Sequence, residues 1–151
     1  MTLKRLLIVD DDTDMSQMLA QHLGNEGFMV FTATTESQIS EAIDRGRVDL
    51  ILLDVMLGEE NGLEICRQLR TEQDVPIILV SALSADNHRI SGYSVGADDY
   101  IAKPFNPDLL VARVKAVLRR NQRSSSLKYR RNTTSYNFNG WSYDGKRSEV
   151  I

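Results

Sequence analysis

The stretch that decides the fold is Asp49-Leu-Ile-Leu-Leu-Asp-Val-Met-Leu-Gly-Glu-Glu-Asn-Gly62, where an apolar run ends at a carboxylate and passes into a polar loop. The run Leu50–Leu53 is too short to span a membrane and does not alternate, so it predicts a strand buried on both faces of a parallel sheet. In such sheets, ligands bind at the carboxyl ends of the strands. Asp54, which follows the run directly, is therefore the first candidate for a functional residue.

Length and composition predict one globular domain and a fragment of a second. The chain has 151 residues, of which 42% are hydrophobic and 26% charged. No stretch approaches the roughly 20 apolar residues of a membrane helix, and the N-terminus lacks the apolar core of a secretory signal. We therefore expect a cytoplasmic protein that does not enter a membrane. The single cysteine, Cys66, excludes an internal disulfide and predicts a buried side chain.

Charge is divided unevenly along the chain. Residues 1–121 hold 12 Lys+Arg against 19 Asp+Glu, a net charge of -7, whereas residues 122–151 hold 6 against 2, a net charge of +4. The polar stretch 121–134 has almost nothing to bury, as is typical of a linker. We expect one domain over residues 1–121, a linker over 122–134 and the start of another domain over 135–151.

Apolar runs and helical patterns alternate through the first 120 residues. This order predicts an α/β fold with a parallel sheet, right-handed crossovers and helices on both faces. The strands are expected at Leu6–Val9, Phe28–Phe31, Leu50–Leu53, Ile77–Val80 and Tyr100–Ile101, and the helices at Thr13–Asn25, Ser37–Arg45, Gly62–Thr71, Asp86–Val95 and Pro107–Arg120.

Polar side chains follow four of the five expected strands. Asp10 and Asp11 follow the first strand, Asp54 the third, Ser81 the fourth and Lys103 the fifth. Each residue alone is more simply a turn, a cap or a solvated side chain. Because the carboxyl ends of parallel strands meet at one edge of the sheet, their joint occurrence instead predicts a common site.

The composition of this site indicates its chemistry. Carboxylates brought together repel one another unless a cation lies between them, and oxygen ligands without His or Cys favour Mg²⁺. A lysine and a hydroxyl on the same rim complete a set of groups that can bind a phosphoryl group. We expect Asp54 to be the nucleophile that accepts this group as an acyl phosphate.

Four motifs of the chain resemble the receiver domain of two-component response regulators. They are Leu7-Ile-Val-Asp-Asp-Asp12, the segment around Asp54, the pair Ser81-Ala82, and Gly96-Ala-Asp-Asp-Tyr-Ile-Ala-Lys-Pro-Phe105. The resemblance covers residues 3–121. It implies a flavodoxin-like (βα)5 doubly wound sheet with strand order 2-1-3-4-5, and a signalling switch rather than an enzyme with a separate substrate.

The resemblance also implies a metal site and a phosphoryl donor. Asp54 would take its phosphoryl group from a sensor histidine kinase. Mg²⁺ would be bound by Asp11, Asp54 and the backbone carbonyl of Met56, with Asp10 assisting through water.

Further residues acquire roles from the same resemblance. Ser81, the backbone N–H of Ala82 and Lys103 would hold the phosphoryl oxygens. Tyr100 matches the switch aromatic of the family and would move inward as Ser81 is drawn to the phosphoryl group.

Two residues depart from the family pattern. Gly58 stands where many relatives have proline, so the loop after Asp54 is expected to be less rigid. Leu109, beside Asp108, stands where the winged-helix subfamily usually has a glutamate, which puts one interfacial ion pair in doubt.

The last residues resemble the first strands of the winged-helix DNA-binding domain in OmpR/PhoB-type transcription factors. The carriers are the aromatic run Tyr136–Asp144 and the segment Lys146–Val150, although an ordinary aromatic hairpin would show the same pattern. We expect promoter DNA to be bound only through a C-terminal domain that these residues begin. A basic linker is usually only solvated, so Arg123, Lys128, Arg130 and Arg131 are not taken as DNA ligands.

The subfamily resemblance predicts a homodimer that forms on phosphorylation. The interface would use the fourth helix, the fifth strand and the fifth helix of the domain. Its charged residues could pair across a two-fold axis: Arg89, Asp98, Asp99, Arg113, Arg119 and Arg120.

Two other functions compete with the switch. A phosphatase of the haloacid-dehalogenase type also uses a strand-end aspartate with Mg²⁺, but normally has a second acid where this chain has Met56, and it needs a lid domain. A receiver-like interaction module that accepts no phosphoryl group is disfavoured because no expected site residue is missing.

Overall fold

The computed structural model describes residues 3–82 and 96–133, and the side chains up to residue 121. No helix in this part of the chain is long and apolar enough to cross a membrane. The expected helix 86–95 and the expected strands after residue 134 lie outside the described residues. The elements are β1 (Arg5–Val9), α1 (Thr13–Asn25), β2 (Met29–Ala33), α2 (Glu36–Arg45), β3 (Leu50–Asp54), β4 (Met56–Leu57), β5 (Glu60–Asn61), α3 (Gly62–Glu72), β6 (Ile77–Ser81), β7 (Asp99–Ala102) and α5 (Pro107–Thr133).

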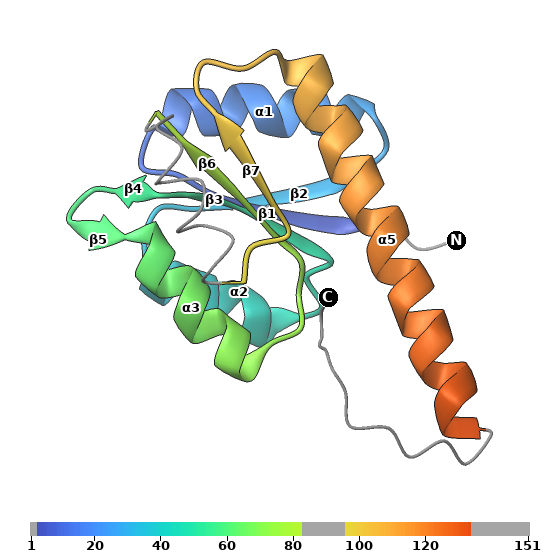
Figure 1. The fold of residues 1–151 in the computed structure, drawn as a ribbon. Helices are drawn as coiled ribbons and strands as arrows, with labels where there is room; N and C mark the ends of the chain where they lie inside the picture. Colours follow the sequence, from blue (N-terminus) through green and yellow to red (C-terminus); the bar gives the residue numbers. More distant parts are fainter. Residues whose placement is uncertain (1–2, 83–95, 134–151) are drawn as a thin grey trace. The chain divides into compact units, whose positions relative to one another are not determined.

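A five-stranded sheet forms the centre of the domain (Figure 1). Its strand order is β2-β1-β3-β6-β7, and every neighbouring pair is parallel. This order confirms the expected 2-1-3-4-5 arrangement of a doubly wound α/β fold. Every residue of β3 and β6 is buried, as the unbroken apolar runs predict.

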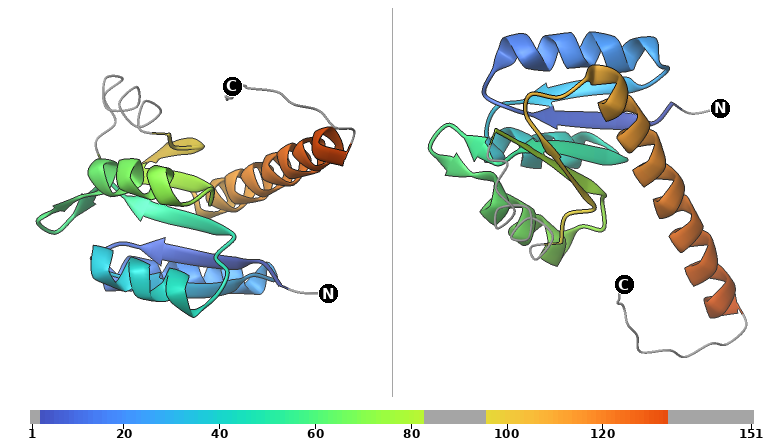
Figure 2. Two further views of the ribbon diagram at one scale, coloured as in Figure 1. Left: turned by 90° about the horizontal axis from the view of Figure 1, so that it is seen from below. Right: turned by 45° about the horizontal axis from the view of Figure 1, so that its top comes forward.

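Two apolar clusters cover the two faces of the sheet. Leu6 and Ile8 of β1 pack with residues of α1 and α5, whereas Leu7 and Val9 pack with residues of α2 and α3. Figures 1 and 2 show α1 on one side of the strands and α2 with α3 on the other. Because side chains alternate along a strand, one apolar run supplies both faces. Cys66 of α3 is buried as expected, and burial raises the pKa of its thiol to about 11.

Helix caps lie directly behind the strand ends. The Asp12 carboxylate accepts a hydrogen bond from the Met15 N–H at 3.1 Å, and the Asn61 side chain accepts one from the Leu63 N–H at 2.8 Å. Each cap satisfies an N–H that has no partner inside the helix. Thus α1 and α3 both begin at the edge of the sheet where the polar residues gather.

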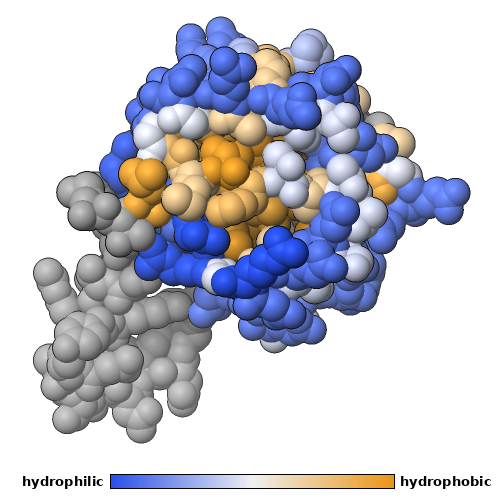
Figure 3. Space-filling view, turned by 180° about the vertical axis from the view of Figure 1, so that it is seen from behind, coloured by the Kyte–Doolittle hydropathy of each residue, from blue (hydrophilic) through white to orange (hydrophobic). Residues whose placement is uncertain are grey.

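The edge strand β2 is the least buried strand of the five-stranded sheet. Met29 and Phe31 are 41% and 38% exposed, and Arg5 lies 4.6 Å from the centre of the Phe31 ring. Figure 3 looks onto the side opposite to Figure 1 and shows an apolar area bordered by polar residues. As the edge strand, β2 has a neighbouring strand, β1, on one side only.

The last helix differs from the expectation. Helix α5 continues to Thr133, whereas the sequence pattern ended it at Arg120. The assignment of 122–134 to a linker stays a prediction. The segment is polar but contains no glycine or proline, so nothing in it stops a helix. The inward residues expected for this helix, Leu110, Val114, Val117 and Leu118, are all buried.

Candidate functional site

Three carboxylates meet at the carboxyl ends of β1 and β3. Oxygen atoms of Asp10, Asp11 and Asp54 all lie within 4.8 Å of one another. Asp10 and Asp54 are buried, with 5% and 6% exposed, whereas Asp11 is exposed. The first strand and the third strand are neighbours in the sheet, so their chain continuations bring these side chains together. The site lies in the first of two compact units, Met1–Leu118 and Arg119–Ile151.

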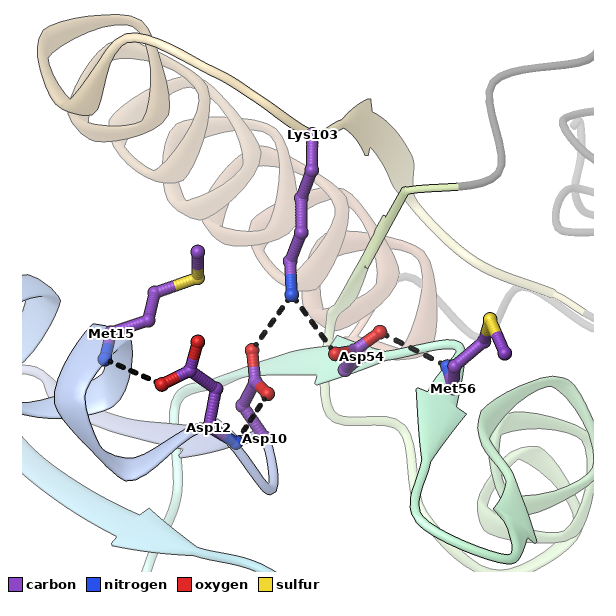
Figure 4. A network of polar contacts seen from close by, with 6 residues as sticks. All are labelled: Asp10, Asp12, Met15, Asp54, Met56 and Lys103. Carbon is purple, nitrogen blue, oxygen red and sulfur yellow. Dashed lines mark hydrogen bonds and ion pairs between the residues drawn. The ribbon is translucent and has the colours of Figure 1, made fainter.

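One lysine joins the two buried carboxylates. Lys103 Nζ lies 3.1 Å from Asp10 Oδ2 and 3.0 Å from Asp54 Oδ2 (Figure 4). The Lys103 N–H donates to the Ser81 carbonyl at 2.6 Å, which holds the lysine just past the end of β7. Burial lowers the pKa of Lys103, but its hydrogen bonds and charge attraction to the two carboxylates outweigh that effect and raise it. The ammonium therefore stays charged between two acids.

Asp54 lies in surroundings that disfavour its charge. Burial raises the pKa of Asp54, and the neighbouring Asp10 carboxylate adds to the increase. Hydrogen bonds from the Met56 N–H, at 3.0 Å to Oδ1, and from Lys103 oppose the shift without cancelling it. A further cation at this site would relieve the remaining repulsion.

A short hairpin follows Asp54 and was not expected. Strands β4 and β5 pair Met56 with Asn61 and Leu57 with Glu60, and Leu57 is buried. Gly58 in the turn has φ +60°, a conformation that proline cannot adopt because its ring holds φ near -65°. The departure from the proline of many relatives thus accompanies a different backbone conformation. The expectation of a less rigid loop stays a prediction.

Gly62 is a site-supporting residue to which sequence reasoning gave no role. A Cβ atom at this position would lie 2.1 Å from the Asp54 carbonyl oxygen and 2.7 Å from the Val55 Cα. The Gly62 N–H also donates to the Val55 carbonyl at 2.7 Å. Helix α3 can therefore begin against the backbone of Asp54 and Val55 only because residue 62 has no side chain. The Asn61-Gly62 pair at the end of residues 49–62 is the sequence feature that could have indicated this role.

The other expected site residues lie as follows. Ser81 is buried at the end of β6, and Ala82 follows it at the surface. Tyr100 is 4% exposed and packs in the cluster on the α2 and α3 side of the sheet. Its side chain is thus already inside in this structure. The Met56 side chain is 56% exposed, and its N–H contacts Asp54.

Three of the residues expected at a dimer interface, Asp98, Asp99 and Arg113, have contacts within the chain. Asp98 pairs with Arg70 of α3 at 2.9 Å, and Asp99 pairs with Arg113 of α5 at 2.9 Å. Arg70 also donates to the Gly96 carbonyl at 2.8 Å, a link that sequence reasoning missed. Arg119 and Arg120 are exposed, and Arg89 lies outside the described residues.

The donor set fits a hard divalent cation. Among the described residues, the three acidic side chains that could hold a metal ion offer carboxylate oxygens, two from buried residues and one from an exposed residue. Mg²⁺ is usually held by one or two carboxylates and keeps positions for water and phosphate oxygens. Three acids against one lysine also leave an excess of negative charge. The acidic triad is typical of a Mg²⁺-binding receiver site.

Comparisons with known proteins agree with this geometry. Residues 6–115 match the family model described as "Response regulator receiver domain". The chain is 44% identical over 119 residues to the DNA-binding response regulator MtrA of Mycolicibacterium smegmatis, covering 79% of this chain and 52% of that protein. It is 37% identical over 147 residues to the transcriptional regulatory protein YvrH of Bacillus subtilis, covering 97% and 61%.

A solved structure gives the same result. The crystal structure of the response regulator DrrB, a Thermotoga maritima OmpR/PhoB homologue, has a TM-score of 0.72 at 35% identity, covering 80% of this chain and 54% of that one. The chain spans about half to three fifths of the length of the curated relatives it matches. A family model matches most of the chain, the relatives have this similarity, and Asp10, Asp11 and Asp54 form an acidic pocket. The chain therefore belongs to the response regulator receiver domain family of two-component signalling proteins.

Proposed function

We propose that this chain is a phosphorylation-activated switch in which Asp54 accepts a phosphoryl group from a sensor histidine kinase. The observation that carries the proposal is the charge imbalance of the pocket, where two buried carboxylates share one ammonium and a third carboxylate lies beside them. A receiver domain implies a histidine kinase as partner. Because the phosphoryl donor would be a cytoplasmic kinase domain, the chain would act in the cytoplasm.

Mg²⁺ would be held by Asp11, Asp54 and the Met56 carbonyl, with Asp10 acting through water. When bound, the ion would neutralise charge on the phosphoryl oxygens. The short distances among the three carboxylates support this assignment, since such a group repels itself without a cation.

In the transfer step, an Asp54 carboxylate oxygen attacks phosphorus. The bond from phosphorus to the histidine nitrogen of the kinase breaks, and that nitrogen keeps the electron pair, which leaves an acyl phosphate on Asp54. Lys103, already 3.0 Å from Asp54, would pair with a phosphoryl oxygen. The Ser81 hydroxyl and the Ala82 N–H would donate to the other phosphoryl oxygens. Tyr100, as the switch aromatic, would change position when Ser81 moves.

Metal dependence tests the assignment. Asp11→Ala removes a direct oxygen ligand, so we expect a weaker response of phosphoryl transfer to Mg²⁺. Lys103→Ala should impair activation more than Mg²⁺ binding, because the lysine pairs with the added group. The transfer rate from a small phosphodonor, measured against Mg²⁺ concentration, separates the two variants. An Asp11→Ala titration that matches the wild type would contradict the metal assignment, and many turnovers of the donor would favour the phosphatase alternative.

We further propose that phosphorylation promotes a symmetric dimer. The fourth helix, β7 and α5 would form the interface, with Arg89, Asp98, Asp99, Arg113, Arg119 and Arg120 as its charged residues. Exposed ion pairs contribute only about 0–1 kcal/mol each, and Asp98 and Asp99 already have partners within the chain, so the unphosphorylated dimer should be weak. Sedimentation with and without a phosphoryl mimic tests this, and equal association in both states would overturn it.

The longer protein would be a transcription factor. MtrA and YvrH are named as DNA-binding and transcriptional regulators. Specific readout requires an element that places side chains against base edges, which the winged-helix domain proposed to begin at residue 135 would supply. The present chain should therefore not bind promoter DNA selectively in a mobility-shift assay at physiological salt. Sequence-selective retention by these 151 residues would contradict that assignment.

A further inference from the structure

The β4–β5 hairpin has a second anchor away from Asp54. Glu60 lies in β5, and its Oε1 accepts a 3.0 Å hydrogen bond from the backbone N–H of Glu36. Glu36 is the first residue of α2, 24 positions earlier in the chain. The first N–H groups of a helix have no partner inside the helix, and the helix dipole favours a carboxylate beside them. Glu60 therefore connects the hairpin to the start of α2.

The start of α2 is in turn linked to Asp10, another carboxylate of the acidic pocket. Ala33 ends β2, and its carbonyl accepts a 3.1 Å hydrogen bond from the Asp10 N–H. Thr35, the residue before Glu36, caps α2 by accepting from the Gln38 N–H at 3.3 Å. The short segment from Ala33 to Glu36 is thus held at both ends. Glu36 is therefore connected to Asp10 through the short segment that begins at Ala33.

The hairpin itself contacts two carboxylates of the pocket. The Met56 N–H binds Asp54 Oδ1 at 3.0 Å. A Cβ atom at Gly58 would lie 3.8 Å from Asp11 Oδ2, so the turn of the hairpin lies beside Asp11. A shift of the hairpin would therefore change the position of Met56 and of the turn relative to both acids.

We infer that Glu60 is a positioning residue of the acidic pocket, which holds the hairpin against α2 so that Asp11, Asp54 and Met56 keep the spacing that Mg²⁺ requires. The inference rests on the proposed function, in which these three residues bind the ion. Glu60 acts through Glu36 and the hairpin backbone and is not itself a ligand. Lys103 joins the two buried acids directly, whereas Glu60 joins the hairpin that follows Asp54 to the start of α2.

The test compares variants of the full 151-residue chain. Glu60→Ala should weaken Mg²⁺ binding about two- to fivefold, the effect of a carboxylate at a helix N-terminus, in titrations followed by the amide resonances of Asp54 and Met56. Glu60→Gln keeps an oxygen that can accept from the Glu36 N–H, so most of the affinity should return. Before Mg²⁺ is added, the Glu36 amide should move upfield and exchange faster with solvent in Glu60→Ala alone.

Glu59→Ala is the matched control. It removes the same charge from the neighbouring exposed residue, whose side chain has no hydrogen bond or ion pair within the described residues. An equal loss of Mg²⁺ affinity in this variant would show a long-range charge effect and overturn the inference. Wild-type affinity in Glu60→Ala would overturn it too. A wild-type chain that binds no Mg²⁺ would instead overturn the proposed function, and the inference with it.

Discussion

The two ends of strand β7 lie in opposite electrostatic surroundings. At its start, each acid has its own arginine: Asp98 pairs with Arg70 and Asp99 with Arg113, both at 2.9 Å. The Asp98 carboxylate also accepts from the Ile77 N–H at 2.8 Å. Among the described residues, these two acids and two arginines pair one to one. These contacts fasten β7 to α3, β6 and α5.

Just past the other end of β7, the described acidic side chains outnumber the cations that pair with them. Lys103 is the only cation paired with Asp10 and Asp54 among the described residues, and Asp11 adds a third acid. Burial and the charge of Asp10 raise the pKa of Asp54 despite the lysine. A balanced pair holds a structure together, whereas a buried excess of one charge marks a place where a charged ligand is needed.

Removal of Lys103 should produce the largest effect of this comparison. Lys103→Ala leaves two buried carboxylates without their shared cation and should lower the free energy of unfolding by about 3 kcal/mol at neutral pH. Addition of Mg²⁺ should restore part of the loss, because the ion supplies the missing charge. Lys115→Ala is the control, since its pair with Glu26 is exposed. Urea unfolding with and without Mg²⁺ measures both, and a loss that Mg²⁺ does not relieve would contradict the charge account.

Removal of an arginine at the balanced end should cost less. Arg70→Ala removes hydrogen bonds to Gly96 and Asp98, and we expect a loss of about 1–2 kcal/mol. Mg²⁺ should not change this loss, since no unpaired acid cluster results. Arg67→Ala, one turn earlier on α3 with an exposed partner in Glu64, is the control. Rescue of Arg70→Ala by Mg²⁺ beyond its effect on the wild type would remove the distinction between the two ends.

Neutralisation of Asp54 should give the smallest change, and in the opposite direction. The pKa of the Asp54 carboxyl is higher in the folded chain than in the unfolded chain. At a pH between the two values, the folded chain keeps the proton and the unfolded chain has lost it. Ionisation of Asp54 therefore lowers the free energy of unfolding as the pH rises above the unfolded pKa. Asp54→Asn should therefore raise the thermal midpoint at neutral pH without Mg²⁺. The difference from wild type should shrink as the pH falls below that unfolded value. Asp44→Asn, an exposed acid on α2, should show no such gain; a lower midpoint in Asp54→Asn would refute the sign.

The sheet and the pocket could be predicted from sequence because both follow from local patterns. Unbroken apolar runs such as Leu50–Leu53 are recognisable as buried strands. Parallel strands then bring Asp10, Asp54 and Lys103 to one edge of the sheet, independently of the loop conformations. Strand boundaries were predicted less well, since Asp54 and Ser81 continue the hydrogen-bond ladder of their strands.

The remaining features depend on contacts that no local pattern encodes. The contact of Glu60 with α2 joins residues that are distant in the chain, and the close approach of Gly62 to the Asp54 carbonyl appears only when α3 is placed against β3. The extension of α5 to Thr133 was missed for another reason. The polar composition after Arg120 offered no apolar stripe by which to extend the helix, although helix propensity does not require one.

The most direct test of the account is the intact mass of the chain after incubation with a small phosphodonor and Mg²⁺. We expect the stoichiometric addition of one phosphoryl group to the wild type and to Asp44→Asn, and none to Asp54→Asn, because an amide is not a comparable nucleophile. Removal of Mg²⁺ by a chelator should abolish the addition. Wild-type incorporation in Asp54→Asn would contradict the assignment of Asp54 as the phosphoacceptor.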